Sequence, residues 1–177
     1  RMGWLGDRAT GSLGECYIFD NHLLYNKWEQ DIREAQRKDS VISDVAPHYW
    51  SIYGDNVTWP MAFYNVADML YRQFGDIRAI IENYEPMKRF MLHLKNKYMK
   101  NCIITHDTYG DWCMPPESPE LIHSKDPSRI TNGKILSTSA YYQLCLKMAN
   151  FAKLSGNNKD ISFWKDLAKE TRQAFNN

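Results

Sequence analysis

The sequence has few of the residues that mark disordered or charge-driven proteins. Among its 177 residues there are only 9 glycines and 7 prolines, while aromatic residues make up 14%. This composition excludes a disordered or low-complexity chain. Lysine and arginine total 22 against 21 aspartates and glutamates, a net charge of +1, and the basic residues are scattered along the chain. We therefore expect no nucleic-acid partner held by charge.

Long apolar runs are also absent. No stretch approaches the about 18 to 20 apolar residues that a membrane-spanning helix needs, so we expect no membrane insertion. The sequence begins at Arg1 and not at a methionine, so the lack of a leader at this position has no bearing on export.

The usual metal and cofactor signatures are missing as well. The 5 histidines form no i, i+4 pair, and the sequence has no G-x-S-x-G, P-loop or dinucleotide glycine pattern. We therefore expect neither a metal site nor a cofactor. The 4 cysteines have no C-x-x-C spacing and are expected to be mostly buried thiols: Cys16, Cys102, Cys113 and Cys145.

What the sequence does contain is helical periodicity. Apolar residues recur at steps of three to four in five segments, at 21–37, 56–74, 77–99, 137–155 and 158–175. No segment shows sustained period-two alternation. Two long irregular stretches, 38–55 and 100–136, separate the helices, and loops of that length in a compact domain are usually functional. The pattern predicts an all-α fold of antiparallel helix pairs.

The dipeptide Gly-Asp is over-used. At Gly75-Asp76 the pattern is typical of a helix end followed by the cap of the next helix. The other three copies each lie close to a tryptophan, namely Trp4, Trp59 or Trp112. A carboxylate that takes hydroxyl groups, beside an indole that covers an apolar ring face, is a combination suited to binding sugars.

The first seven residues, R-M-G-W-L-G-D, are the most informative in the chain. Two glycines around Trp4, followed by Asp7, predict a tight, non-helical loop that presents both side chains. A purely structural turn is the alternative.

This opening resembles the R-x-G-W-x-G-D half of the acidic signature of bacterial α-L-rhamnosidases, family seventy-eight of the glycoside hydrolases. The fuller signature reads D-C-P-Q-R-D-E-R-x-G-W-x-G-D. Further matches with compatible spacing follow at residues 53–55 leading to Trp59, at 74–76, at 109–112 and at 137–142. The resemblance spans nearly all 177 residues.

The resemblance implies a piece of an (α/α)6 barrel, the six-hairpin toroid, whose connecting loops build a sugar pocket at one end. The predicted helices cannot close such a barrel. We therefore expect residues 1–177 to form about the first half of the catalytic domain, truncated at both ends, with the remainder of the same polypeptide as its partner.

The resemblance also assigns the chemistry. In the family the general acid is the glutamate directly before the residue that matches Arg1, and the general base lies in the second half of the barrel, beyond Asn177. Without both, the isolated chain should be inactive. Asp7 is the catalytic candidate that remains: it would contact rhamnose hydroxyls and raise the pKa of the general acid by like-charge repulsion. The alternative for Asp7 is a helix cap.

The binding candidates follow from the same matches. Trp4, Trp59 and Trp112 match aromatic positions that line the family's sugar pocket, although Trp59 is also a candidate for the core because it falls in a predicted helix. Trp28 and Trp164 lie on apolar helical stripes and are expected in the core.

Asp111 is a further candidate for hydroxyl contacts. Weaker candidates are Asp55, for hydroxyl contacts; His106, with Asp107 beside it, at the pocket border; and Arg1, as an ion-pair partner in the acidic cluster. For Asp55 and Asp111 the alternative is a helix cap or an ordinary loop acid.

The expected function is inverting hydrolysis of terminal α-L-rhamnose from glycosides or polysaccharides, by a larger enzyme of which this chain is a part. The alternatives are a non-catalytic helical carbohydrate-binding or scaffold piece, and another (α/α)6 glycosidase with different sugar specificity. Family members are often exported, so a periplasmic or extracellular address is slightly favoured.

Overall fold

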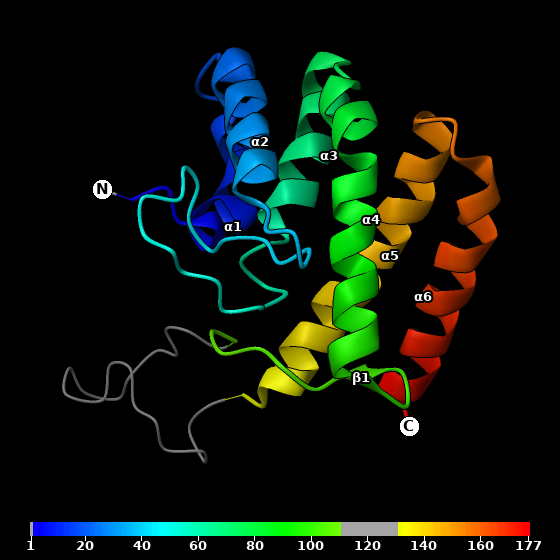
Figure 1. Ribbon diagram of the computed structural model, residues 1–177. Helices are drawn as coiled ribbons and strands as arrows, with labels where there is room; N and C mark the ends of the chain where they lie inside the picture. Colours follow the sequence, from blue (N-terminus) through cyan, green and yellow to red (C-terminus); the bar gives the residue numbers. More distant parts are fainter. Residues whose placement is uncertain (1, 111–130) are drawn as a thin grey trace.

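Helices dominate the structure, a computed structural model that describes residues 2–110 and 131–177 (Figure 1). The described elements, in chain order, are α1 (Leu5–Glu15), α2 (His22–Ala35), α3 (Ala62–Phe74), α4 (Arg78–Tyr98), β1 (Met99–Lys100), β2 (Ile103–Ile104), α5 (Gly133–Leu154), the 3-10 turn η3 (Asn158–Asp160) and α6 (Ile161–Phe175). The prediction of an all-α fold is confirmed, with a single two-residue hairpin, β1–β2, as its only sheet among the described residues.

The six described helices form two rows. One row holds α1, α3 and α5, in which α1 packs on α3 and α3 packs on α5. The other row holds α2, α4 and α6; α2 packs on α4, and α6 packs along α5 of the first row. Figure 1 shows α2, α4 and α6 in front of α1, α3 and α5. The helices of one row run antiparallel to those of the other, which is the arrangement expected of part of a helical toroid.

Helix α3 is the centre of the core. Eight of its residues are buried, including Phe63, Tyr64 and Leu70 with no exposed surface. It ends at Gly75, whose φ of 68° is left-handed and suits glycine. The Asp76 carboxylate then accepts a hydrogen bond from the Arg78 amide at the start of α4, although the N-cap position is Ile77 and not Asp76 as predicted.

The two ends of the helical array differ. At one end α1 joins α2, α3 joins α4 and α5 joins α6 through short turns. At the other end, where α1 begins and α4 ends, lie the long connections that include residues 36–61 and 99–110 (Figure 1). The second end therefore collects the segments in which the candidate site residues fall.

Two local predictions were wrong near the candidate site. Residues 5–7 are not part of a loop, because α1 begins at Leu5 and carries Gly6 and Asp7 in its first turn. Trp59 does not lie on a helix, because α3 begins only at Ala62. Pro60 and the polar residues before it leave the preceding turn outside the regular helix.

The start of α5 also differs from the prediction. The helix begins four residues before Ser137, at Gly133, where the Asn132 side chain accepts a hydrogen bond from the Lys134 amide. Ser137 and Thr138 are buried instead, and both hydrogen-bond to the backbone of Ile104. These hydroxyls attach the hairpin to α5.

The expectations for cysteines and core tryptophans hold in part. Cys145 is buried, but Cys16 and Cys102 are partly exposed; Cys113 lies outside the described residues. Trp164 is fully buried, as predicted. Trp28 packs against the core while keeping some exposure, and its indole N–H donates to the Ala46 carbonyl at 2.8 Å.

No helix within residues 2–110 and 131–177 is both long and apolar enough to cross a membrane.

Candidate functional site

The opening motif is held in place by the chain that follows α2. The Leu5 amide donates to the Asp44 carbonyl, and the Ala46 amide donates to the Gly3 carbonyl, each at 3.0 Å. An alanine Cβ at Gly3 would collide with the Ala46 carbonyl, so this close pairing requires glycine. The first residues of the motif thus run antiparallel to residues 44–46.

This pairing orients the two principal candidates. Trp4 is the last residue before α1, pairs with Val45 and is partly exposed. Asp7 is exposed in the first turn of α1, where a negative charge interacts favourably with the helix dipole. The N-cap position belongs to Trp4, so Asp7 does not occupy the position of a capping residue.

Trp59 packs directly on the motif. A Cβ added at Gly6 would lie 2.6 Å from Cδ2 and 2.8 Å from Cζ2 of the Trp59 indole, far inside contact distance. The indole therefore occupies the space that a side chain at Gly6 would need. Because Gly6 lies between Trp4 and Asp7 in sequence, the structure brings Trp59 to the motif that carries both residues.

The opposite face of Trp59 is covered by Tyr109. The two ring centroids are 4.1 Å apart and the ring planes differ by 20°, which is a stacked arrangement. Trp59 remains partly exposed between Gly6 and Tyr109.

Asp107 joins the turn that holds Trp59 to the turn that holds Tyr109. Its carboxylate accepts hydrogen bonds from the amides of Val57 and Thr58 and the hydroxyl of Thr58, each at 3.0 Å, and from the amides of Tyr109 at 3.0 Å and Gly110 at 2.9 Å. One carboxylate thereby orders two segments that are about fifty residues apart in the sequence.

Asp44 forms a second link, and its side chain has no exposed surface. Its carboxylate accepts hydrogen bonds from the Gly54 amide at 2.9 Å and from the Tyr109 hydroxyl at 3.2 Å. Burial raises the pKa of Asp44 to about 6, against the opposing effect of these two donors.

Asp55 and His106 lie beside this cluster, at the end of α4. The Asp55 carboxylate is bound by the side chains of His93, Lys97 and Tyr98 at 2.8–2.9 Å. Burial alone would raise the pKa of Asp55, but these three hydrogen bonds outweigh it and lower the pKa.

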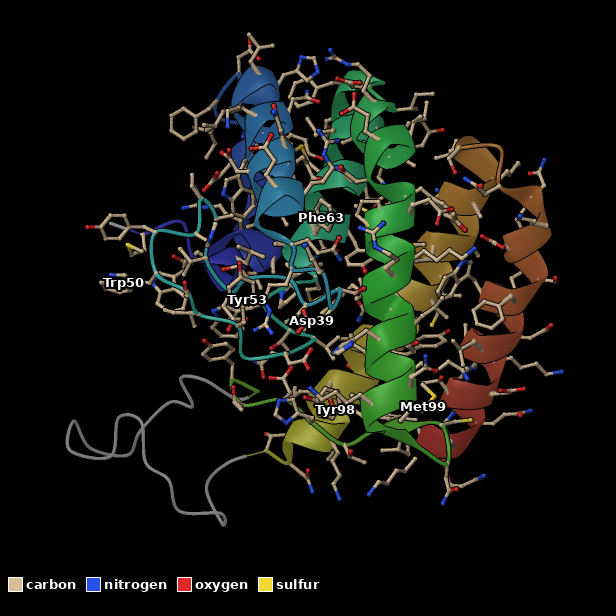
Figure 2. The ribbon with its side chains drawn as sticks, in the orientation of Figure 1. Asp39, Trp50, Tyr53, Phe63, Tyr98 and Met99 are labelled. Atoms are coloured by element: carbon tan, nitrogen blue, oxygen red, sulfur yellow. The ribbon has the colours of Figure 1, made fainter. Side chains whose placement is uncertain are left out.

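His106 lies within 3.0 Å of the Gly54 carbonyl through Nε2 and stacks on Tyr98, with centroids 4.5 Å apart. Figure 2 shows Tyr98 at the end of α4 beside the long connections, and shows Trp50 on the opposite side of them, turned away from the helices. The contacts of Asp55 and His106 therefore join the 54–59 turn to α4.

Three predicted site residues, Arg1, Asp111 and Trp112, lie outside the described residues. In the part of the chain that the structure describes, no group of three His, Cys, Asp or Glu side chains could hold a metal ion.

Sequence reasoning missed the polar residues that hold the site together. Asp44 had a usable signal, since it is the one acid in the mostly apolar segment 41–46. Asp107 was predicted with His106 to border the pocket, and Tyr109 was part of a motif match, but neither was predicted to hold the site together. No local pattern indicates that they share partners with residues 54–59.

The family of the chain follows from a comparison with family models. The model described as the bacterial alpha-L-rhamnosidase 6 hairpin glycosidase domain matches residues 1–177. The chain belongs to this family. The resemblance drawn from the opening motif is thereby confirmed, and so is the partial six-hairpin architecture.

Individual rhamnosidases agree with this assignment. An alpha-L-rhamnosidase of Streptomyces avermitilis is 27% identical over 99% of this chain, and one of Formosa agariphila is 24% identical over all of it. The chain spans only 16% and 18% of those two proteins.

Solved rhamnosidase structures have the same fold. The alpha-L-rhamnosidase from Dictyoglumus thermophilum superposes with a TM-score of 0.87 at 34% identity, covering 99% of this chain and 19% of that one. The Streptomyces avermitilis rhamnosidase, solved in complex with L-rhamnose, gives 0.83 at 25% identity and covers 98% of this chain and 16% of that one. The described helices thus match one part of each of these longer rhamnosidases.

Proposed function

We propose that this chain is the part of a larger inverting α-L-rhamnosidase that carries one wall of the sugar pocket. The observation that carries the proposal is the placement of the rhamnosidase motif. Asp7 is exposed in the first turn of α1, and Trp59 packs against Gly6 of the same turn. An exposed acid and a partly exposed indole on one helix end suit a sugar with both hydroxyl groups and an apolar face.

Asp7 acts on the general acid and on the sugar. In the family's signature the general acid is the residue directly before the position of Arg1, so Asp7 lies one short segment away along the chain. A second negative charge near that glutamate disfavours its ionisation and raises its pKa toward the working pH. Asp7 also accepts hydrogen bonds from rhamnose hydroxyls.

The tryptophans supply the apolar side of the pocket. Rhamnose is a 6-deoxy sugar, and its methyl group and ring face pack on the indoles of Trp4 and Trp112. The faces of Trp59 contact Gly6 and Tyr109, so Trp59 meets the sugar through the exposed edge of its ring. Asp111 is proposed to contact hydroxyl groups. Arg1, Asp55 and His106 remain weaker proposals; the contacts of Asp55 and His106 with α4 and Gly54 favour a role at the edge of the pocket.

Hydrolysis proceeds by single displacement. One carboxylic acid protonates the leaving oxygen while a carboxylate on the other side of the sugar activates water, with the two carboxyl groups about 6.5–9.5 Å apart. Both groups are proposed to lie outside residues 1–177. The isolated chain should therefore bind sugar weakly at most and not turn it over.

The test compares the full-length polypeptide with the 177-residue chain on p-nitrophenyl α-L-rhamnopyranoside. Only the full-length protein should release p-nitrophenol, and NMR during the first turnovers should show β-L-rhamnose forming before mutarotation. Release of the α anomer first would overturn the inverting mechanism. Turnover by the 177-residue chain in proportion to its concentration would overturn the location of the acid and base.

Specificity is tested with p-nitrophenyl α-L-arabinofuranoside and β-D-glucopyranoside as matched substrates. Full-length protein that cleaves either of these but not the rhamnoside would favour a glycosidase of different specificity. Protein that binds rhamnose yet cleaves none of the three would favour a carbohydrate-binding role.

A further inference from the structure

We infer that Asp107 is a positioning residue that fixes the indole of Trp59 at the sugar pocket. The inference rests on the proposed function, in which Trp59 contacts the sugar. Asp107 itself is assigned no contact with the substrate, and acts through the turn to which it is hydrogen-bonded.

The geometry of the carboxylate supports this role. Oδ2 accepts the two consecutive amides of Val57 and Thr58, and Thr58 also directs its hydroxyl at the same carboxylate. Trp59 is the next residue along the chain. Any displacement of this carboxylate therefore moves the backbone that carries the indole.

Oδ1 of Asp107 orients the other ring of the stack. It accepts the amides of Tyr109 and Gly110, so the tyrosine ring that covers Trp59 is attached to the same carboxylate as Trp59 itself. The backbone segments that carry both rings are thus hydrogen-bonded to the same side chain, Asp107. The geometry explains how two segments far apart in sequence keep their rings 4.1 Å apart.

The position of Trp59 lets such a restraint act directly on the indole. Trp59 lies in the turn before α3, where its carbonyl accepts a hydrogen bond from the Ala62 amide at 3.1 Å. One face of the indole contacts Gly6, which has no side chain that could restrict the movement of the ring. A misplacement of about 1 Å in a residue that positions the substrate can cost on the order of 10²-fold in rate, so fixing this turn also fixes the contact between the indole and the sugar.

The carboxylate oxygens of Asp107 are already occupied by hydrogen bonds from within the protein. Five donors from four residues occupy the two carboxylate oxygens, which leaves little capacity for a sugar hydroxyl. This distinguishes it from Asp7, which is exposed. Asparagine at position 107 keeps the shape but aims an N–H₂ group at donors, so it weakens one of the two attachments.

The test is a double-mutant cycle in the full-length polypeptide, with p-nitrophenyl α-L-rhamnopyranoside as substrate. The variants are Asp107→Asn, Trp59→Ala and the double variant, with Asp166→Asn on the exposed face of α6 as the matched control. We expect Trp59→Ala to raise KM on the order of tenfold, and Asp107→Asn to raise it several-fold, with kcat changed less than KM in both.

The decisive value is the effect of Asp107→Asn when Trp59 is already absent. Because Asp107 is proposed to act through the indole, the second substitution should change KM by no more than about twofold in the Trp59→Ala background. Effects on KM that multiply in the double variant would overturn the inference. So would an Asp107→Asn variant that lowers kcat with KM unchanged, which would indicate contact with the reacting groups.

Thr58→Val provides a milder version of the same test should Asp107→Asn fail to fold, as judged by circular dichroism. It removes one donor to the carboxylate and should raise KM about two- to threefold, again only while Trp59 is present. A parent protein with no activity on the rhamnoside would refute the proposed function. An active parent with independent effects of the two substitutions would refute the positioning role alone.

Discussion

Gly6 and Trp59 are in direct contact across the boundary between the opening motif and the turn before α3. The indole lies where a side chain at position 6 would be, at less than 3 Å from the position of an added Cβ. Glycine is therefore required at position 6, the second glycine of the motif, by its contact with Trp59. It is not required by its own backbone conformation, since Gly6 lies within α1 and has no positive φ.

Gly6→Ala should displace Trp59 and so weaken sugar binding. Alanine would normally stabilise a helix by about 0.5–1 kcal/mol relative to glycine, but here overpacking should cost about 1–3 kcal/mol and dominate. We expect KM for the rhamnoside to rise on the order of tenfold and the thermal midpoint to fall. Steady-state kinetics and circular dichroism melting of the full-length protein measure both.

Gly14→Ala is the matched control in the same helix. An added Cβ at Gly14 meets nothing within 4 Å, so the helix-propensity gain should appear without a clash. A Gly6→Ala protein that behaves like Gly14→Ala, with unchanged KM and slightly raised stability, would contradict the contact.

Asp7→Asn should act on turnover more than on binding or stability. The substitution keeps the shape of the side chain and removes the charge that raises the pKa of the general acid. We expect kcat to fall on the order of 10²-fold or more, with KM within a few-fold of the parent. The thermal midpoint should hardly move because Asp7 is exposed. If kcat stays within a few-fold of the parent, Asp7 is a structural residue of the first turn.

Asp44→Asn should flatten the dependence of stability on pH. Burial raises the folded-state pKa of Asp44 from 3.8 to about 6. A raised carboxyl pKa means that the folded state holds the proton more tightly than the unfolded state. The contribution of this group to stability is therefore full below about pH 4 and is lost as the pH rises through about 6.

An asparagine at position 44 stays neutral throughout that range. Between pH 4 and pH 7 the parent should therefore lose on the order of 1–3 kcal/mol relative to the Asp44→Asn protein. Denaturant unfolding at a series of pH values measures the difference. Parallel curves for parent and variant would show that the pKa of Asp44 is the same in the folded and unfolded states, which would contradict the prediction.

The turn between α1 and α2 should make the isolated chain self-associate. Six large apolar side chains around it are exposed: Leu13, Tyr17, Ile18, Phe19, Leu23 and Leu24, between 49% and 78%. Clusters of this kind drive association unless another surface covers them. We expect the 177-residue chain to sediment as dimers or larger species at micromolar concentration.

Substitution within this cluster tests its role. Ile18→Lys with Leu23→Lys should shift the sedimentation profile toward monomer, since both residues are more than 70% exposed and neither supports the core. Ile135→Lys, which changes an exposed apolar residue on α5, should leave the profile unchanged. A parent chain that is already monomeric would contradict the expectation.

The sequence alone predicted the helices and the family. Helical periodicity depends on local spacing of apolar residues, so it indicated five of the six helices, and the motif at residues 1–7 identified a rhamnosidase domain. It also predicted the end of α3 at Gly75 and the start of α4 after Asp76, because both depend on local backbone conformation and hydrogen bonding.

Only the tertiary structure determined how the candidate site is assembled. The helical state of residues 5–7, the turn that carries Trp59 and the burial of Asp44 depend on residues distant in the chain. Asp107 binds amides about fifty residues away, and a single sequence contains no periodic signal for such a pairing. Hydrogen bonds and ring contacts between loops are specified by three-dimensional proximity, whereas helices are specified by the residues of one segment, and this physical difference separates what could be predicted here from what could not.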